Sequence, residues 1–348
     1  MRHRKPGGVR TRESLMKVRA ASPGHQAIIG VGNGRRVGWS ATCAVIGALL
    51  VSACGGGSAD DADPGDASGA ASAAGNPSAV EQPSGSSSGL ETQPPYTGYP
   101  DSIAVIAHSA ATGEGTAPPT GTDPKANSWA TGTNPEVNSI YQRILAENPD
   151  IEGNTVNLAV GGATMADMNG QAQALSTVEP RPELVLIQTI DNDIACPATE
   201  QDYESFGADL SRVLDTLEET APNARVFLVT QFGSPETYAA AMSPDQRVRN
   251  GQLMGAPAPC AFLDADGNIV PEELRQLEGI ITSYEAELGR VCKQHELCTW
   301  DHNAMSQAVE EPQDINDKDL AHFSIPGHAH VAALAWAALK EQGLIPAS

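Results

Sequence analysis

The chain has 348 residues, with 21 Lys and Arg against 43 Asp and Glu, which gives a net charge of −22 at pH 7. Residues 1–53 hold nine of the basic residues and one acid, Glu13, so the remainder carries 12 basic and 42 acidic residues and a net charge near −30. A surface of this charge repels nucleic acid and anionic lipid, so the folded part is not expected to bind either.

The N-terminal segment has the pattern of an export signal. Its basic residues precede the short apolar run AVIGALLVSAC at 44–54, and a bilayer-spanning helix needs roughly 20 apolar residues. The sequence VSA before Cys54 resembles a bacterial lipobox, so we predict that residues 1–53 are a lipoprotein signal peptide and that Cys54 is lipidated. An ordinary signal peptide cut after a small residue is the alternative.

Residues 54–95 are rich in Gly, Ser, Ala, Asp and Pro. This composition predicts a disordered tether, which a lipid-anchored domain needs, and it favours the lipoprotein interpretation. We therefore expect the protein to be exported, with its domain outside the cytoplasm and attached to the cell envelope only through the lipid on Cys54. Residues 96–348 are long enough for one α/β domain.

Apolar runs alternate with helical patterns along the folded part. Buried strands are predicted at 102–107, 155–160, 183–189 and 224–230, and helices at about 135–147, 164–176, 201–220, 271–293 and 326–342. The sequence Asn134-Pro135-Glu136 is typical of a helix start. Continuously apolar strands, each followed by a helix, indicate a parallel sheet covered on both faces. The prediction is a three-layer α/β/α sandwich with a central, mostly parallel sheet.

Four cysteines lie in this region, and an even number in an exported protein favours disulfides. Of the three possible pairings we expect Cys292 with Cys298, which closes a short loop, and by elimination Cys196 with Cys260. Zinc is the alternative, but the chain has no C-x-x-C pair and no clustered histidine with ligand spacing. No metal site is predicted.

Two motif matches are better explained by structure than by chemistry. GSSSG at 85–89 matches a nucleophile elbow but lies in the tether, where no strand or helix flanks it. DADGNIVPEE at 264–273 resembles a calcium loop, but Phe262 stands where its first acid should be. An Asp-Gly hairpin turn explains this segment better.

Polar and glycine residues follow three of the predicted strands. Ser109 follows the first, Gly161 and Gly162 follow the second, and Asn192 and Asp193 follow the third. Ligands of parallel sheets bind at the carboxyl ends of the strands. These residues are therefore the first candidates for a functional site, with Asp193 expected to support the Asn192 loop by hydrogen bonding.

Four sequence blocks resemble those of the SGNH (GDSL-like) hydrolase family, in the family's order: AHSAATG, NLAVGGAT, IDNDI and DLAHFS. The resemblance implies an SGNH-hydrolase, flavodoxin-like fold over 96–348. It also implies roles for individual residues: Ser109 as nucleophile, His322 as general base, Asp319 as the group that orients His322, and an oxyanion hole made by Ser109, Gly162 and Asn192.

The chemistry of ester cleavage needs such a set. A serine hydroxyl is a weak nucleophile until a base takes its proton, and an aspartate against the other imidazole nitrogen fixes the tautomer. We predict a serine esterase or acylhydrolase that forms an acyl-enzyme, needs no cofactor, acts as a monomer and cleaves an acylated glycan, a lipid or a small ester. A glycan O-acyltransferase and a non-catalytic binding lipoprotein on a hydrolase scaffold are the alternatives.

The chain departs from the family at three positions. Ala107 and His108 replace the Gly-Asp before the serine, and Ile190 replaces the glycine of the third block. We expect His108 to hold the loop, with a substrate contact or an effect on the pKa of His322 as alternatives. Ile190 is expected to reduce backbone freedom near the site.

Three further residues have less specific expectations. Trp129 is equally compatible with a pocket wall and with a packed core. His328 and His330 are expected at the surface or at the start of the last helix, and neither is expected to be a ligand.

Overall fold

The computed structural model describes residues 98–116, 124–253 and 260–347. The predicted signal peptide, Cys54 and the whole tether with its GSSSG motif lie outside these residues. Within the described parts of the chain, no helix combines the length and apolar character needed to cross a membrane.

A five-stranded sheet forms the centre of the domain, with the strand order β2-β1-β3-β4-β5. All neighbouring strands are parallel. The strands are β1 (Ile103–Ala107), β2 (Thr155–Asn157), β3 (Leu184–Gln188), β4 (Arg225–Val229) and β5 (Cys298–Trp300). The first four confirm the predicted strands. Strand β5 was not predicted, because this three-residue edge strand has no continuous apolar run.

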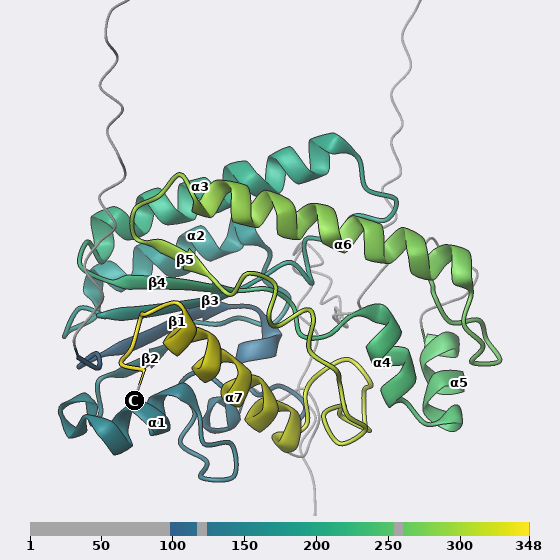
Figure 1. The fold of residues 1–348 in the computed structure, drawn as a ribbon, viewed down its shortest axis with the longest axis horizontal. Helices are drawn as coiled ribbons and strands as arrows, with labels where there is room; N and C mark the ends of the chain where they lie inside the picture. The colour runs from purple at the N-terminus through teal and green to yellow at the C-terminus, as the bar shows by residue number, and fades with distance from the viewer. Residues whose placement is uncertain (1–97, 117–123, 254–259, 348) are drawn as a thin grey trace, which may run out of the picture. The chain divides into compact units, whose positions relative to one another are not determined.

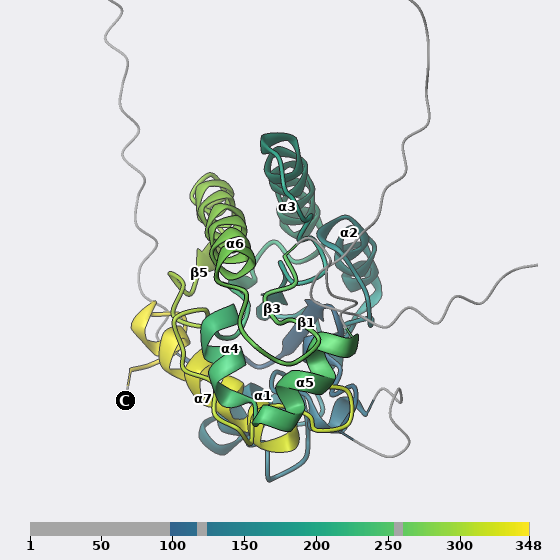
Figure 2. The ribbon, with the colours of Figure 1, turned by 90° about the vertical axis from the view of Figure 1, so that its right-hand side faces the viewer.

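Helices cover both faces of the sheet, which confirms the three-layer sandwich (Figures 1 and 2). One layer contains α2 (Met165–Ala174), α3 (Glu200–Thr220) and α6 (Pro271–Cys292), and the other contains α1 (Ile140–Glu147) and α7 (Ile325–Glu341). Side chains of a strand alternate between its two faces. Accordingly, Ala104 and Ile106 pack in the core under the first layer, whereas Ile103 and Val105 pack in the core under the second.

The predicted start of the first helix was wrong. Residues 135–137 form a turn, and the helix begins only after Ser139, whose hydroxyl accepts the amide of Gln142 in a capping box. Asn138 between them has a φ of 49°, in the left-handed region that ends a regular helix. The Asn134 side chain accepts the amide of Glu136 and so stabilises a turn in place of a helix N-terminus.

Two helices were not predicted from the sequence. They are α4 (Pro235–Ala241) and α5 (Pro244–Leu253), which follow β4. The α5 segment has few buried residues, Asn250 and Gly251 among them, so it lacks the apolar periodicity by which helices are predicted. The α4 helix is short but starts with a Ser234–Thr237 capping box and a proline.

The hairpin predicted at Asp264 is present. Leu263 and Ile269 form an antiparallel bridge, and Gly267 at the turn has a φ of 78°. The Asp264 carboxylate accepts the amides of Asp266 and Asn268. Its oxygens therefore stabilise the turn, which explains why the segment resembles a calcium loop.

Both predicted disulfides are present. Cys196–Cys260 joins the loop after β3 to the hairpin, with Cα atoms 6.1 Å apart. Cys292–Cys298 closes the connection between α6 and β5, with Cα atoms 5.3 Å apart. Both distances lie in the usual range for disulfides.

Candidate active site

The end of β1 is held by a side chain from α2. Gln171, which is buried, accepts a hydrogen bond from the Ala107 amide at 2.8 Å and donates one to the Ala107 carbonyl at 3.0 Å. A side-chain amide thus pairs with both backbone groups of the last strand residue, much as a neighbouring strand would. Ser109 follows two residues later and begins a short 3₁₀ turn, Ser109–Ala111. The position of Ser109 is therefore set by the sheet and by Gln171.

His108 is buried beside Ser109 and is engaged on both ring nitrogens. Its Nδ1 accepts the Ala110 amide at 3.2 Å, and its Nε2 lies 2.9 Å from a carboxylate oxygen of Asp191. Because Nδ1 accepts, the proton of the neutral ring is on Nε2, which lies close to the carboxylate but without the geometry of a hydrogen bond. These contacts support the expected loop-holding role. Asp191 was missed in the sequence, although it follows Ile190 directly and could have suggested a partner for the unusual histidine.

His322 and Asp319 form the second half of the site. Nδ1 of His322 lies 3.1 Å from Oδ2 of Asp319, and the other carboxylate oxygen accepts the amides of Ala321 and His322. Both oxygens of Asp319 are thus used, and the imidazole is oriented with Nε2 pointing away from the carboxylate. This is the arrangement by which an aspartate fixes the tautomer of a catalytic histidine.

Burial and charge shift the titration of both groups. Burial alone would raise the pKa of the Asp319 carboxyl, but the hydrogen bonds from His322 and the Ala321 amide lower it below its usual value. Burial also disfavours a charged His322. The hydrogen bond and charge of Asp319 outweigh this effect, with further contributions from Glu114 and Asp191, so the pKa of His322 is raised.

The loop between Asp319 and His322 has a strained backbone. Leu320 has a φ of 54°, which is unfavourable for a bulky side chain. The Tyr238 hydroxyl from α4 donates to the Leu320 carbonyl, and the Asn316 amide donates to the His322 carbonyl at 2.9 Å. These bonds hold the loop in the conformation that pairs Asp319 with His322.

Ser109, Asn192 and His322 line one cavity of about 80 Å³. None of the described residues forms a hydrogen bond with Oγ of Ser109, and the serine and histidine are not hydrogen-bonded to each other. Such bonds are often long in proteins without substrate. The structure therefore brings together the predicted nucleophile, the predicted base and one predicted oxyanion donor, with Asp319 held against the base.

Asn192 and Gly162, which were predicted as oxyanion donors along with Ser109, differ in their position relative to the cavity. The Asn192 amide donates one hydrogen bond to the Ala163 carbonyl at 3.0 Å, which leaves its second N–H for another acceptor. Gly162 does not line the cavity with Ser109 and lies in a neighbouring depression. Gly161 is nearer, since a Cβ on it would lie 4.0 Å from the Ser109 Cβ.

Asp193 ties the third block to α2. It accepts the Met165 amide at 2.9 Å and the Thr189 hydroxyl at 3.2 Å, and burial raises its pKa to about 6. The expected support of the Asn192 loop is thus present. Ile190, fully buried, has a φ of 91°, a conformation that a β-branched residue adopts only under strain. This strain explains why glycine suits the position.

Glu114 is a site residue that sequence reasoning missed. Its Oε2 lies 3.8 Å from Nε2 of His322, and a Cβ on Gly161 would lie 2.7 Å from the same oxygen. The neighbouring Gly115 packs closely on the relay, since a Cβ there would lie 2.8 Å from Oδ2 of Asp319. The only available signal was the position of Glu114 in the glycine-containing loop after Ser109.

Glu310 is a second missed residue, and it also lines the cavity. Burial raises its pKa to about 8, although the Thr237 hydroxyl donates to it at 3.1 Å and opposes the rise. At neutral pH this carboxyl is therefore mostly protonated and can donate a hydrogen bond into the cavity.

The structure shows where Trp129, His328 and His330 lie, which the sequence had left open. Trp129 is fully buried in the core, where Nε1 donates to Gln188 at 2.8 Å, and it does not line the cavity. His328 lies at the start of α7, as expected, but it is buried and not at the surface, and burial lowers its pKa to about 3. His330 is partly exposed and pairs with Asp314 at 2.8 Å.

A family model described as GDSL-like Lipase/Acylhydrolase matches residues 101–335. This range contains all four blocks and every residue of the cavity. The chain belongs to this family. Membership supports hydrolase activity, and the five-stranded parallel sheet with helices on both faces is consistent with the three-layer fold of SGNH hydrolases.

Solved structures resemble this GDSL-like hydrolase at low identity. An acetyl xylan esterase from Geobacillus stearothermophilus is 16% identical, with a TM-score of 0.41, over 70% of this chain and 95% of that one. A phospholipase A1 from Streptomyces albidoflavus is 12% identical, with a TM-score of 0.41, over 69% of this chain and 98% of that one. No match was found among curated proteins.

Proposed function

We propose that this GDSL-like hydrolase is a serine esterase that cleaves carboxylic esters through Ser109, His322 and Asp319. One observation carries the proposal. Ser109 and His322 line the same cavity, and His322 is oriented by a hydrogen bond from Nδ1 to Asp319, so that Nε2 is available to a proton from the serine.

The proposed reaction has two halves. Ser109 Oγ bonds to the ester carbonyl carbon while Nε2 of His322 takes the serine proton, and Asp319 stabilises the resulting imidazolium. The carbonyl oxygen becomes an oxyanion, for which Asn192 and the Ser109 amide are the proposed hydrogen-bond donors. The ester C–O bond then breaks, and the leaving alcohol receives the proton from His322. Water repeats these steps on the acyl-enzyme and releases the acid.

The size of the cavity supports a short acyl group. Its volume is about 80 Å³, well below the roughly 300–1,000 Å³ of pockets that enclose drug-sized ligands. A cavity of this size fits an acetyl group better than a long chain. The cavity walls include the aromatic residues Phe232, Tyr238 and Phe262, which suit a methyl or ethyl group. Acetylated glycans and small acetate esters are accordingly the proposed substrate class.

A fluorophosphonate probe tests the relay directly. We expect the purified protein to be labelled on Ser109, with the adduct located by peptide mass spectrometry, and labelling to disappear in His322→Ala. Circular dichroism of both proteins verifies the fold. Folded protein that takes no label would contradict the esterase proposal and favour the binding lipoprotein, and an adduct on another serine would place the site elsewhere.

The acyl preference and the fate of the acyl group need separate measurements. Hydrolysis of p-nitrophenyl acetate is expected to exceed that of the octanoate in kcat/KM. Equal or greater activity on octanoate would contradict the short-chain proposal. Transfer to a glycan hydroxyl in preference to water, measured by mass spectrometry with a soluble glycan present, would favour the acyltransferase alternative.

We also propose that the protein is an exported lipoprotein anchored through Cys54. The basic segment, short apolar run and VSA sequence before Cys54 support this, together with the composition of residues 54–95. Membrane-fraction mass spectrometry is expected to find a diacylated N-terminal cysteine at position 54. A Cys54→Ser variant should lose the lipid, and an unmodified N-terminus at another residue would contradict the proposal.

A further inference from the structure

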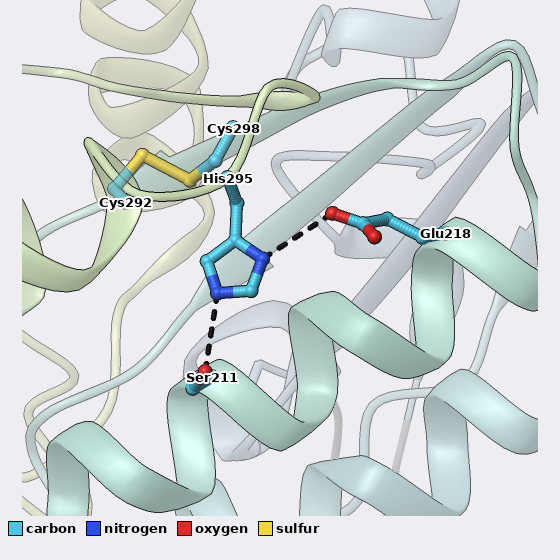
Figure 3. Close-up of a disulfide and its surroundings, with 5 residues drawn as sticks. All are labelled: Ser211, Glu218, Cys292, His295 and Cys298. Carbon is cyan, nitrogen blue, oxygen red and sulfur yellow. Dashed lines mark hydrogen bonds and ion pairs between the residues drawn. A yellow bond between two sulfur atoms is a disulfide. The ribbon is translucent and has the colours of Figure 1, made fainter. Parts of the chain in front are cut away.

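A histidine outside the cavity is held against two carboxylates of α3. His295 lies in the loop that Cys292–Cys298 closes between α6 and β5, and its side chain is 9% exposed (Figure 3). The ring points from this loop toward the surface of α3. The disulfide limits the movement of the loop, so the imidazole is presented from a rigid support.

Each ring nitrogen of His295 faces a different group on α3. Nε2 lies 3.1 Å from the Ser211 hydroxyl, and Nδ1 lies 3.3 Å from Oε1 of Glu218 and 3.8 Å from Oδ1 of Asp215 (Figure 3 shows Ser211 and Glu218). Positions 211, 215 and 218 are four and three residues apart, so they share one face of the helix. The imidazole therefore closes a three-ligand cluster on that face.

We propose that Asp215, Glu218 and His295 bind a divalent transition-metal ion of the zinc type. Their ligand atoms all lie within 4.8 Å of one another. Tetrahedral zinc with bonds of about 2.0 to 2.2 Å separates its ligand atoms by about 3.3 Å, which is the observed distance between His295 and Glu218. Charge-assisted hydrogen bonds between nitrogen and carboxylate are shorter, typically about 2.7 to 2.9 Å.

Ser211 can form a hydrogen bond with the ring nitrogen of His295 that does not bind the metal ion. A metal-bound imidazole donates its second N–H to a nearby acceptor, which fixes the tautomer. In the tautomer in which Nε2–H donates to the Ser211 hydroxyl, the Nδ1 lone pair faces the two carboxylates, and a metal ion can be bound between them. In the other tautomer the Ser211 hydroxyl donates to Nε2 and Nδ1–H donates to Glu218, with no ion.

The surroundings favour a metal ion. Within the described residues, neither Asp215 nor Glu218 forms an ion pair with lysine or arginine, and their side chains are 67% and 48% exposed. An ion therefore has a route from solvent and finds two negative charges that no arginine or lysine neutralises. Nitrogen together with two carboxylates suits zinc, whereas calcium and magnesium prefer oxygen ligands alone. A water molecule would complete the tetrahedron.

The role of the ion would be structural. It would link α3 to the α6–β5 loop by bonds to side chains of both, and none of its ligands lines the active-site cavity. The esterase reaction is therefore expected to continue without it. The alternative is a plain ion pair, in which a protonated His295 makes the same link.

Equilibrium dialysis against micromolar ZnCl₂ at pH 7.5 tests the proposal, with bound zinc measured by elemental analysis. We expect the wild-type protein to retain one zinc ion that His295→Gln loses, and zinc to raise the Tm of the former only. His302→Gln is the matched control, because this exposed histidine lies near the same loop, packs on Trp300 and is outside the cluster. It should retain the ion.

His322→Ala tests whether zinc binds at the active-site histidines instead. This variant should retain the zinc ion at Asp215, Glu218 and His295. If His295→Gln fails to fold, Glu218→Gln removes one ligand at an exposed position and should weaken zinc binding at least tenfold. Retention of zinc by both ligand variants, or no zinc on the wild-type protein, would overturn the proposal and leave the ion pair.

Discussion

The carboxylate of Glu114 lies 3.8 Å from Nε2 of His322, the ring nitrogen opposite the one that contacts Asp319. A negative charge at this distance stabilises the imidazolium, and it contributes to the raised pKa of His322. The same carboxylate lies beside Gly161, near the glycine block expected to help hold the oxyanion. The Glu114 carboxylate therefore stabilises the positive charge that forms on His322 in the proposed reaction, and it disfavours the negative charge of the oxyanion.

A pH profile separates these effects. The proposed base is active as neutral imidazole, so kcat/KM should fall as the pH drops through the raised pKa of His322, with a midpoint above 6.5 in the wild-type protein. Glu114→Gln removes the charge and should move the midpoint to lower pH. Gln keeps the size of the side chain, so an unchanged midpoint in a folded variant would show that Glu114 does not influence the base.

Asn192 is the proposed oxyanion donor that lines the cavity together with Ser109 and His322. Asn192→Ala should lower kcat by about 10²- to 10³-fold with little change in KM, because the lost hydrogen bond forms mainly in the transition state. Steady-state kinetics on an acetate ester measures this. Loss of the bond to the Ala163 carbonyl affects the fold as well, so thermal unfolding is the control. Full activity in a folded variant would argue against the proposed hole.

Gln171 is predicted to act on catalysis through the backbone of Ala107. Gln171→Leu keeps a similar volume but leaves the buried amide without its acceptor, which should destabilise the protein by about 1–3 kcal/mol. Displacement of the loop should also slow fluorophosphonate labelling of Ser109. Chemical denaturation and labelling kinetics measure the two effects. Unchanged labelling would mean that Ser109 is positioned without Gln171.

Glu310 should make stability depend on pH. Its folded pKa is about 8, above the usual 4.5, so its proton is held more tightly in the folded than in the unfolded state. The contribution is complete below about 4.5 and is lost as the pH rises through 8. Glu310→Gln mimics the protonated acid and should flatten the decline of Tm between pH 5 and 9. An identical decline in both proteins would assign it to other groups.

Strands β1 to β4, the layers and the Cys292–Cys298 disulfide were predictable because each has a local signal, and the Cys196–Cys260 disulfide followed by elimination. Apolar runs such as 184–188 mark buried strands, and the four family blocks contain the candidate residues in order. Local sequence signals led to wrong or missing predictions where the backbone does not have the conformation that they favour. Asn138 turns the chain away from the predicted helix start, and α5 buries too few apolar residues to show a period.

The sequence by itself determined the α/β sandwich and the expected pairing of the cysteines, since spacing and apolar pattern are properties of the chain. The resemblance of four blocks to the SGNH family identified the candidate serine, histidine and aspartate. Only the tertiary structure brought Glu114 to His322, Asp191 to His108 and His295 to α3. These pairs come from segments that pack together only in the folded domain. The distances between their charged groups depend on the fold and cannot be read from the spacing of the residues in the sequence.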